Sequence, residues 1–333
     1  EVPLQAENWS ETTLVRGLQL IAKTKEETIA FEASIRNFLQ DFKNLNEDDY
    51  PLPGNFSSIL RPYQIEGYQW MRKLAENQFG GILADDMGLG KTVQAITFIY
   101  SYIDEIRHKQ SPALIVCPSA VLYNWLQEWM KFVPDMKVVI LDGKQSERQL
   151  IRKDIHVADV VITSYTLIRK DIHWLKNERF HTIIFDEAQS FKNPLTETHK
   201  SVKQLSSQYK FALTGTPIEN AIEDLWSVFH IIFPDLFLGL QQFSELNNAA
   251  IARIIQPFVL RRMKTEVLEE LPVKEEKIER IDLYKEQQKI YLAYLAKLKE
   301  DTLKHLDKRT LRKNRIRILA GLTRLRQLCC HPA

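Results

Sequence analysis

Short apolar runs alternate with helix-like patterns between about residues 55 and 259. This alternation is typical of βαβ units, in which parallel strands form one sheet and the connecting helices cover both of its faces. The chain is therefore predicted to have an α/β fold with a mostly parallel sheet flanked by helices. The clearest predicted strands are Ile82–Ala84, Ala113–Cys117, Val138–Leu141, Val160–Thr163, Thr182–Phe185 and Phe211–Thr214.

The pattern is different on either side of this region. Residues 1–50 are polar but carry apolar side chains at helical spacing, which predicts amphipathic helix. Farther along the chain, the alternating charged stretch Lys274–Leu283 predicts a strand. Two helices rich in Lys, Leu and Arg are predicted after it, over Lys285–Leu306 and Leu311–Leu328.

The composition is typical of a soluble globular protein. The 333 residues are 44% hydrophobic and 26% charged, and no apolar run is long enough to span a membrane. The chain starts at Glu1 without a methionine or a secretory signal, so we expect a segment of a longer intracellular protein. Cys329 and Cys330 match neither a disulfide framework nor a zinc site, and this adjacent pair is expected to be buried.

The net charge is only +2, but basic residues concentrate near the end of the chain. A basic helical face can follow the phosphate backbone of DNA, although such a face is more often simply solvated. Both interpretations stay open. The residues concerned are Lys304, Lys308, Arg309, Arg312, Lys313, Arg315 and Arg317.

A glycine-containing loop, Asp85–Thr92, is the strongest indication of chemistry. It lies between a predicted strand and a helix-like run, Val93–Ile103, an arrangement in which backbone N–H groups and a helix N-terminus bind phosphates. Lys91 would reach the β- and γ-phosphates, and the Thr92 hydroxyl would bind Mg²⁺. Because Asp85 replaces the first glycine of the usual pattern, a plain turn with a solvated lysine is the alternative.

A pair of carboxylates favours the phosphate-binding interpretation. Asp186 and Glu187 follow a predicted strand, and ligands of open α/β sheets bind at the C-terminal ends of the strands. Asp186 can hold Mg²⁺ through a water molecule, and Glu187 can orient the attacking water. Together with Lys91 and Thr92, this pair predicts an ATP hydrolysis site that uses Mg²⁺.

Further motifs follow one another along the chain: Leu60–Gln64, Asp85–Gln94, Leu114–Ser119 with Asn124, Trp125 and Glu128, Thr163–Tyr165, Leu213–Asn220, Phe258–Arg262 with Lys264, Leu271–Lys274 and Leu322–Pro332. Their order resembles the SWI/SNF-type ATPases of helicase superfamily two over roughly residues 55–333. That family also has an acidic residue in place of the first loop glycine. The resemblance implies two RecA-like lobes that close over ATP and move along double-stranded DNA without full strand separation.

The resemblance also implies roles for individual residues. Lys91, Asp186 and Glu187 are the implied catalytic residues. The implied ATP-binding residues are Gln64, which would read the adenine, Asp85, Gly88, Leu89, Gly90, Lys91 and Thr92. The implied DNA-binding residues are Ser119, Asn124, Thr163, Ser164, Tyr165 and Lys192. A role in coupling the state of the bound nucleotide to DNA binding is implied for Gln189, Thr214, Gly215 and Thr216.

The domain organisation follows from the same resemblance. Residues 1–54 would form a helical flanking segment, residues 55–260 the first RecA-like lobe, and residues 261–333 a helical protrusion. A second lobe would lie outside the chain and supply arginine fingers, which are worth about 10³–10⁵ in rate. The chain alone is therefore expected to be monomeric and to hydrolyse ATP poorly, if at all.

Two rival functions remain. The first is a helicase that separates the strands of RNA or DNA, and the second is a nucleotide-dependent module attached to RNA polymerase or another DNA-bound complex.

Many members of the family have histidine where Gln189 stands, and glutamine keeps the hydrogen bonding of that position but not its titration.

Some of these residues also have purely structural interpretations. Ser119 and Thr163 could cap helices, and Arg261 and Arg262 could belong to a solvated turn. Trp125 and Trp129 are four residues apart, so both are expected to pack in the core.

Overall fold

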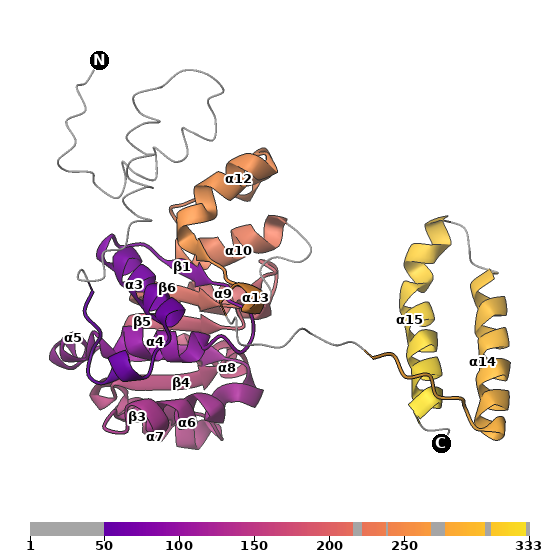
Figure 1. Ribbon diagram of the computed structural model, residues 1–333, viewed down its shortest axis with the longest axis horizontal. Coiled ribbons are helices and arrows are strands. Elements are labelled where there is room, and N and C mark those ends of the chain that lie inside the picture. The colour runs from indigo at the N-terminus through magenta and orange to yellow at the C-terminus, as the bar shows by residue number, and fades with distance from the viewer. Residues whose placement is uncertain (1–49, 216–221, 238, 268–276, 304–307, 331–333) are drawn as a thin grey trace, which may run out of the picture. The chain divides into compact units, whose positions relative to one another are not determined.

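The computed structural model describes residues 50–215, 222–237, 239–267, 277–303 and 308–330. The chain divides into two compact units, with the boundary between Leu271 and Pro272. The first unit contains a sheet with its helices, and the second contains a pair of helices (Figure 1). The amphipathic helix predicted over residues 1–50 lies outside the described residues, except for Tyr50.

The first unit is built on a seven-stranded sheet with the strand order β3-β4-β2-β5-β6-β1-β7. All neighbouring strands run parallel, which confirms the predicted α/β fold, and each strand predicted between residues 82 and 214 is present. The strands are β1 (Gly81–Leu83), β2 (Ala113–Cys117), β3 (Val138–Leu141), β4 (Val160–Ser164), β5 (Arg179–Asp186), β6 (Ser206–Leu213) and β7 (Val259–Leu260).

Strand β7 is not visible in the sequence pattern, because two residues are too few for a periodic signal. It lies at the edge of the sheet and pairs with β1, Ile82 opposite Val259. The ladder continues beyond both strands: the amide of Ala84 donates to the carbonyl of Leu260 at 2.7 Å, and the amide of Asp86 donates to the carbonyl of Arg262 at 3.0 Å. The segment that leaves the sheet therefore runs beside the start of the glycine loop.

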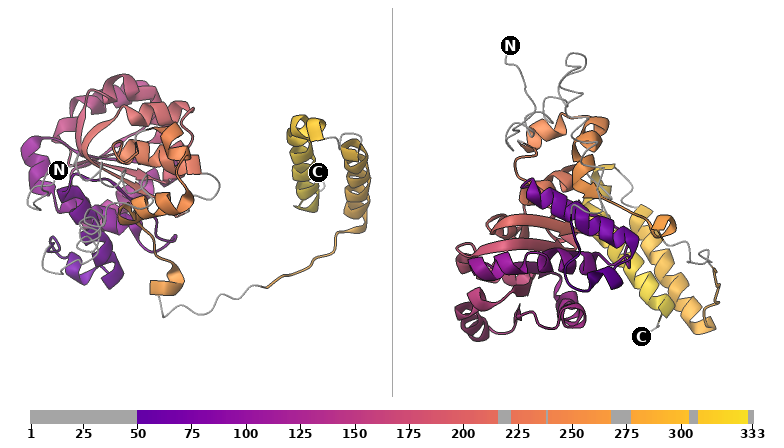
Figure 2. Two further views of the ribbon diagram at one scale, coloured as in Figure 1. Left: turned by 90° about the horizontal axis from the view of Figure 1, so that it is seen from above. Right: turned by 60° about the vertical axis from the view of Figure 1, so that its left-hand side comes forward.

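Helices lie on both sides of the sheet (Figures 1 and 2). Among its described residues, this unit has the α-helices α3 (Pro62–Glu76), α4 (Lys91–Tyr100), α5 (Ile103–Lys109), α6 (Leu122–Phe132), α7 (Gln145–Lys153), α8 (Tyr165–Leu175), α9 (Glu197–Lys203), α10 (Ile222–Ile232), α11 (Leu240–Ser244), α12 (Asn248–Ile255) and α13 (Lys264–Val267). Short 3₁₀ turns are η1 (Phe56–Ser58), η2 (Ser119–Val121), η3 (Ile155–Val157), η4 (Ala188–Phe191) and η5 (Gln256–Phe258).

The helix predicted over Val93–Ile103 is interrupted. Helix α4 ends at Tyr100, and α5 begins at Ile103. The hydroxyl of Ser101 donates to the carbonyl of Phe98 at 2.7 Å, and such local side-chain bonds compete with helical hydrogen bonding. A periodic apolar pattern does not register this competition.

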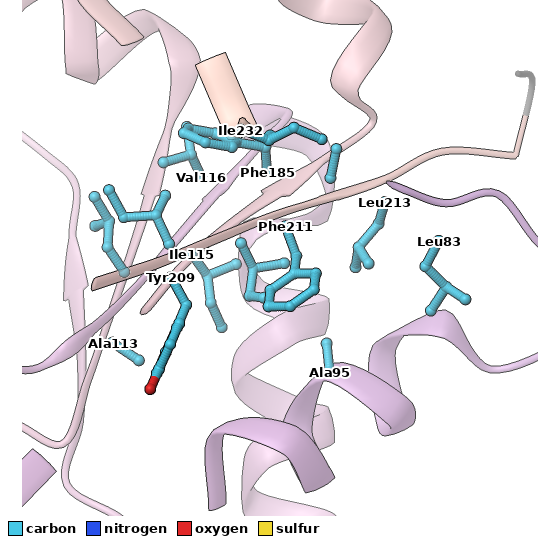
Figure 3. Close-up of a cluster of buried hydrophobic side chains, with 14 of the residues drawn as sticks. Leu83, Ala95, Ala113, Ile115, Val116, Phe185, Tyr209, Phe211, Leu213 and Ile232 are labelled. Carbon is cyan, nitrogen blue, oxygen red and sulfur yellow. The ribbon is translucent and has the colours of Figure 1, made fainter. Parts of the chain in front are cut away.

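Apolar side chains fill the space between the sheet and its helices. Strand β2 and the interior of β5 are fully buried, as expected for central strands covered on both faces. Figure 3 shows Phe211 of β6 directed towards Ala95 of α4, whereas Phe185 of β5 lies with Ile232 of α10 on the opposite face. This core fixes the positions of the strand ends that carry the polar residues described below.

The second unit pairs α14 (Lys285–Leu303) with α15 (Lys308–Cys330), which confirms the two predicted helices. The helices approach closely at Gly321, where a β-carbon would lie 2.3 Å from Cδ1 of Leu298. The strand prediction at Lys274–Leu283 is wrong for its described residues, 277–283, because alternating side chains form a strand only when the backbone has a partner.

The expectation that the adjacent cysteines are buried is also wrong. Cys329 and Cys330 are exposed, because the buried positions in this turn of α15 are Leu325 and Leu328. The basic side chains from Lys304 to Arg317 lie outside the described residues. Among the described helices, none combines the length and the apolar character that a membrane crossing requires.

Candidate nucleotide-binding site

The predicted site residues follow neighbouring strand ends. Leu83 at the end of β1 lies opposite Leu213 at the end of β6, and Leu213 lies opposite Asp186 at the end of β5. The glycine loop follows β1, so in this register one strand, β6, separates the loop from Asp186. Thr214 follows β6, between the two. This is the edge at which open α/β sheets bind ligands.

The glycine loop has the backbone conformation of a phosphate cradle. Gly88 and Gly90 adopt φ angles of 87° and 80°, a left-handed conformation that side chains disfavour. A β-carbon on Gly90 would also lie 2.3 Å from Nε2 of Gln64. Helix α4 begins at Lys91, immediately after Gly90, so its free N–H groups and its dipole are directed at the loop.

Lys91 lies among carboxylates. Its ammonium group donates to the carbonyls of Asp85 and Asp86, at 2.7 and 3.3 Å. Burial lowers the pKa of Lys91, and the nearby carboxylates of Asp85, Glu187 and Asp186 oppose this shift. The loop and the acidic pair predicted from separate motifs are thus brought together. A bound phosphate would offer this half-buried cation a stronger partner than two neutral carbonyls do.

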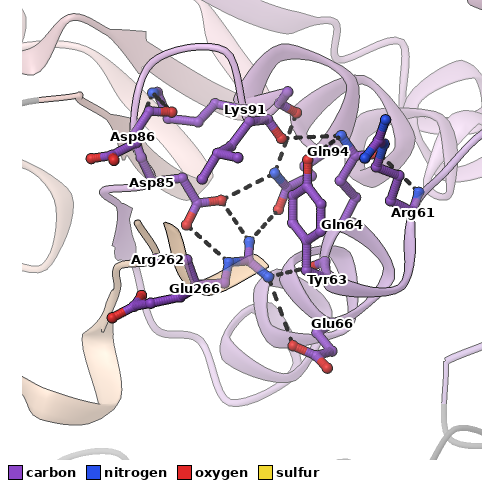
Figure 4. A network of polar contacts seen from close by, with 12 residues as sticks. Arg61, Tyr63, Gln64, Glu66, Asp85, Asp86, Lys91, Gln94, Arg262 and Glu266 are labelled. Carbon is purple, nitrogen blue, oxygen red and sulfur yellow. Dashed lines mark hydrogen bonds and ion pairs between the residues drawn. The ribbon is translucent and has the colours of Figure 1, made fainter. Parts of the chain in front are cut away.

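Asp85 is placed differently from the prediction. Its side chain is fully buried and accepts from the Arg262 guanidinium at 2.6 and 3.0 Å, and from Nε2 of Gln94 at 3.2 Å (Figure 4). A carboxylate enclosed in this way has no surface to offer a nucleotide, so the Asp85 side chain holds the loop, while ATP binding by the rest of this residue stays a prediction. The alternative of a solvated turn is wrong for Arg262, whose side chain is only 9% exposed, whereas Arg261 is exposed.

Arg262 connects three segments that are distant in the sequence. Besides binding Asp85, Arg262 donates to the backbone carbonyl of Tyr63 at the start of α3. It also donates to Oε1 of Gln94 in α4, at 2.9 Å (Figure 4). Gly67 makes room for this network, because a β-carbon there would lie 1.8 Å from Oε1 of Gln94. The segment that leaves the sheet is thereby fastened to the loop and to the segment predicted to recognise adenine.

Gln64 is buried behind the loop. Its Nε2 donates to the carbonyl of Leu89 at 3.0 Å, and its Oε1 accepts from the backbone amide of Arg61 at 2.9 Å. The second bond caps helix α3. Gln64 thus contacts the nucleotide loop directly, while its reading of adenine stays a prediction.

Asp186 is held by neutral donors. The indole Nε1 of Trp125 donates to Oδ2 at 2.8 Å, the backbone amide of Glu187 donates to Oδ1 at 2.9 Å, and the hydroxyl of Tyr165 donates to the backbone carbonyl of Asp186 at 2.7 Å. Burial raises the pKa of Asp186, and Glu187 raises it further, whereas the Trp125 bond lowers it. A nearby cation would therefore stabilise this carboxylate.

Mg²⁺ fits these residues in the manner typical of ATP sites. Within the part of the chain that the structure describes, no group of three or more His, Cys, Asp or Glu could enclose a metal ion. Mg²⁺ bound with ATP needs only one or two protein oxygens, because phosphates and water supply the other ligands. Asp186 and Thr92, the latter in the first turn of α4, offer those oxygens.

A chain of hydrogen bonds joins Glu187 to two of the predicted coupling residues, Gln189 and Thr214. Glu187 adopts a φ of 50°, a strained conformation for a residue with a side chain. The amide of Gln189 donates to the Glu187 carboxylate, and the hydroxyl of Thr214 donates to Oε1 of Gln189 at 3.1 Å. A β-carbon on Gly215 would lie 3.7 Å from Nζ of Lys91, whereas Thr216 lies outside the described residues. The coupling roles themselves stay predictions.

The predicted DNA-binding residues fall into an exposed and a buried group. Ser119 and Asn124 are exposed at the start of η2 and in the first turn of α6. The side chain of Lys192 is 40% exposed and forms an ion pair with Asp224 at 2.9 Å. These residues keep surface that a DNA backbone could contact.

The buried group comes from the end of β4. Thr163 has no exposed surface and donates to the carbonyl of Leu141 at 3.0 Å, while the hydroxyl of Ser164 caps α8 by accepting from the amide of Leu167. Tyr165 donates to Asp186, as described above. The helix-cap alternative offered for Thr163 thus applies to Ser164 instead. Any role of these side chains towards DNA would be indirect.

Sequence reasoning missed what Trp125 and Arg262 do. The prediction that Trp125 and Trp129 pack in the core is confirmed, with 2% and 0% exposure, but it leaves out the bond from Trp125 to Asp186. Both Trp125 and Arg262 do belong to the motifs quoted above. Their partners lie 61 and 177 residues away in the sequence, so motif membership was the only available signal.

The chain is similar to proteins of one family. A family model described as SNF2-related domain matches residues 63–333. A Mycoplasma genitalium protein named as an uncharacterized ATP-dependent helicase is 38% identical over 294 residues, which cover 85% of this chain and 28% of the relative. The chromatin-remodeling ATPase INO80 of Drosophila melanogaster is 32% identical over 372 residues, which cover 100% of this chain and 22% of the relative. The chain thus spans about a quarter of these relatives.

A solved structure, the Sulfolobus solfataricus SWI2/SNF2 ATPase core in complex with double-stranded DNA, has a similar fold. The TM-score is 0.59 at 35% sequence identity, and the match covers 87% of this chain and 61% of that one. The RecA-like fold expected from the motif order agrees with this likeness. Because the SNF2-related model also accounts for most of the sequence, the chain belongs to the SNF2-related family of superfamily-two ATPases.

Proposed function

We propose that the chain is the ATP-binding part of an enzyme that couples ATP hydrolysis to movement along double-stranded DNA. The observation that carries this proposal is the strand register that brings the loop with Lys91 and the pair Asp186 and Glu187 to the same C-terminal ends of the strands. The similar Sulfolobus solfataricus core, described in complex with double-stranded DNA, supports the choice of DNA as partner.

Each residue has a distinct task in this proposal. Lys91 and the N–H groups at the start of α4 bind the β- and γ-phosphates. Thr92 and Asp186 would hold Mg²⁺, Asp186 through a water molecule, and the ion would supply positive charge to the phosphates. Glu187 accepts a hydrogen bond from the attacking water and orients it. Residues 55–260 would then be the ATP-binding lobe and residues 261–333 a helical extension towards a second lobe.

The test is the ATPase activity of the full-length protein with and without duplex DNA. Lys91→Ala and Glu187→Gln should each lower the DNA-stimulated rate by about 10²–10⁴, the range typical of losing a catalytic group. Lys200→Ala and Glu197→Gln are matched controls, because these two residues form an exposed ion pair on α9. A Glu187→Gln variant as active as Glu197→Gln would contradict the proposal.

A strand-separating helicase is the second candidate, because similar proteins are named ATP-dependent helicases. Triplex displacement and strand displacement separate the two functions. The proposed enzyme removes a third strand from duplex DNA during ATP hydrolysis but leaves the duplex paired. Association with RNA polymerase or another DNA-bound complex is tested by co-purification with the full-length protein.

A further inference from the structure

We propose that Trp125 and Tyr165 are positioning residues that transmit the binding of duplex DNA to Asp186. This inference rests on the proposed function and adds a physical connection between the DNA-side motifs and the magnesium carboxylate. Its basis is that both side chains come from predicted DNA-side motifs, yet both bind Asp186.

The two residues hold Asp186 from different elements. Trp125 lies in α6 and donates to the carboxylate, while Tyr165 begins α8 and donates to the backbone carbonyl. Both side chains are buried, with 2% and 7% exposure. An indole N–H can only donate, and the phenol hydroxyl of Tyr165 donates to the carbonyl at 2.7 Å. Both groups therefore act as fixed donors.

Helix α6 connects this contact with the surface. Its first turn exposes Tyr123 and Asn124 and buries Leu122 and Trp125. Asn124 is a predicted DNA contact and directly precedes Trp125. A backbone phosphate bound to the outer side of this turn would therefore restrain the residue next to the indole donor. Orienting the Asp186 carboxylate before nucleotide binds lowers the cost of ordering it around Mg²⁺.

The same helix provides a control residue. Trp129, one turn after Trp125, is fully buried, and its Nε1 has no hydrogen-bond partner among the described residues. Trp125→Phe and Trp129→Phe make the same chemical change in neighbouring turns of α6. Only Trp125→Phe removes a bond to Asp186. A purely structural role of the tryptophan would affect both variants similarly.

The experiment measures how Mg²⁺ strengthens nucleotide binding by the full-length protein. A fluorescent non-hydrolysable ATP analogue is titrated in Mg²⁺ and in EDTA, each with and without saturating duplex DNA. Trp125→Phe should reduce the affinity gain from Mg²⁺ in the presence of DNA by about tenfold, the size of one hydrogen bond to a charged group. Binding in EDTA and the affinity for DNA should change by less than about twofold.

Tyr165→Phe tests the second contact. It should reduce the Mg²⁺-dependent gain by about threefold, since its acceptor is a neutral carbonyl. Tyr68→Phe is the matched control. Tyr68 lies on α3, and its hydroxyl donates to the carbonyl of Pro51 rather than to Asp186. Trp129→Phe and Tyr68→Phe should both behave like the wild-type protein.

The outcomes distinguish the two levels of the proposal. If DNA stimulates the wild-type ATPase but Trp125→Phe binds nucleotide like Trp129→Phe, the positioning role is overturned and the proposed function stands. A Trp125→Phe variant that loses DNA affinity as strongly as Mg²⁺ response would also overturn it, because the indole would then shape the DNA surface. Absence of DNA stimulation in the wild-type protein would refute both.

Discussion

Asp85 and Asp186 are two carboxylates that influence the same lysine, Lys91, yet they have opposite kinds of partner. Asp85 is bound by the guanidinium of Arg262, so its charge is neutralised within the fold. Among the described residues, the Asp186 carboxylate accepts hydrogen bonds only from an indole N–H and a backbone N–H, which are neutral, and Lys91 compensates its charge without a direct bond. The identity of the donor thus separates a carboxylate that fastens a loop from one that can bind a metal ion.

The energetic consequences differ in the same way. A buried ion pair adds little net stability, but removing one partner leaves a charge without compensation and is strongly destabilising. Burying a carboxylate that has only neutral donors lowers the stability of the unliganded protein, and binding of a cation to that carboxylate restores the lost stability. Sensitivity to mutation should therefore appear as unfolding at Asp85 and as loss of activity at Asp186.

Arg262→Met should have the largest effect on stability. It leaves the Asp85 carboxylate buried without its cation, and such losses typically cost about 3–5 kcal/mol. Chemical denaturation of the 333-residue chain measures the free energy of unfolding. The double variant Asp85→Asn/Arg262→Met should recover part of the loss, because the lone charge is removed. Additive losses in the double variant would show that the two side chains are not coupled.

Asp186→Asn should have the next largest effect, on catalysis. The amide keeps the shape of the side chain but loses the charge that binds Mg²⁺, so the DNA-stimulated ATPase rate of the full-length protein should fall by about 10²–10³. The free energy of unfolding should change by less than about 1 kcal/mol, because the donors to Asp186 are neutral. Destabilisation as large as that of Arg262→Met would contradict the comparison.

The contrast between these two residues was not predictable from local patterns. Uninterrupted apolar runs revealed the central strands, and Gly90-Lys91-Thr92 revealed the loop, because both signals are short-range. The pairing of Asp85 with Arg262 joins residues 177 positions apart, and no periodicity encodes it. The missed strand β7 is the physical link, since its ladder with β1 brings Arg262 beside the loop.

The mispredicted elements have the same origin. The alternation at Lys274–Leu283 is a local property, whereas a strand requires a neighbour for its backbone. The break after Tyr100 lies beside a local bond from the Ser101 hydroxyl to the carbonyl of Phe98, which a periodic pattern does not predict. Trp125 was correctly expected to be buried, but burial alone does not say which group its N–H meets. Sequence patterns thus predicted the burial of the central strands and of Trp125, but not which polar atoms pair.

Thr214→Val should have a smaller effect on the catalytic side. It removes the hydroxyl that donates to Gln189, which in turn donates to the Glu187 carboxylate. One neutral hydrogen bond contributes about 1 kcal/mol, so the DNA-stimulated ATPase rate should fall about fivefold. Thr97→Val is the control, because the Thr97 hydroxyl donates to a helical carbonyl within α4. Equal ATPase rates for the two variants would show that the hydrogen bond from Thr214 to Gln189 does not support the function of Glu187.

Lys210 extends the comparison to a partly buried cation and should show the smallest effect. Burial lowers the pKa of this β6 lysine to about 8, and no ion pair formed by the described residues includes it. The unfolded chain holds the Lys210 proton to higher pH, so this group penalises folding below pH 8 and the penalty fades as the pH rises above 8. Lys210→Met should therefore stabilise the 333-residue chain by about 1 kcal/mol at pH 7, with a smaller gain at pH 10. Denaturation at both pH values measures this, and a gain that grows with pH would mean that Lys210 has a compensating partner, as Arg262 does.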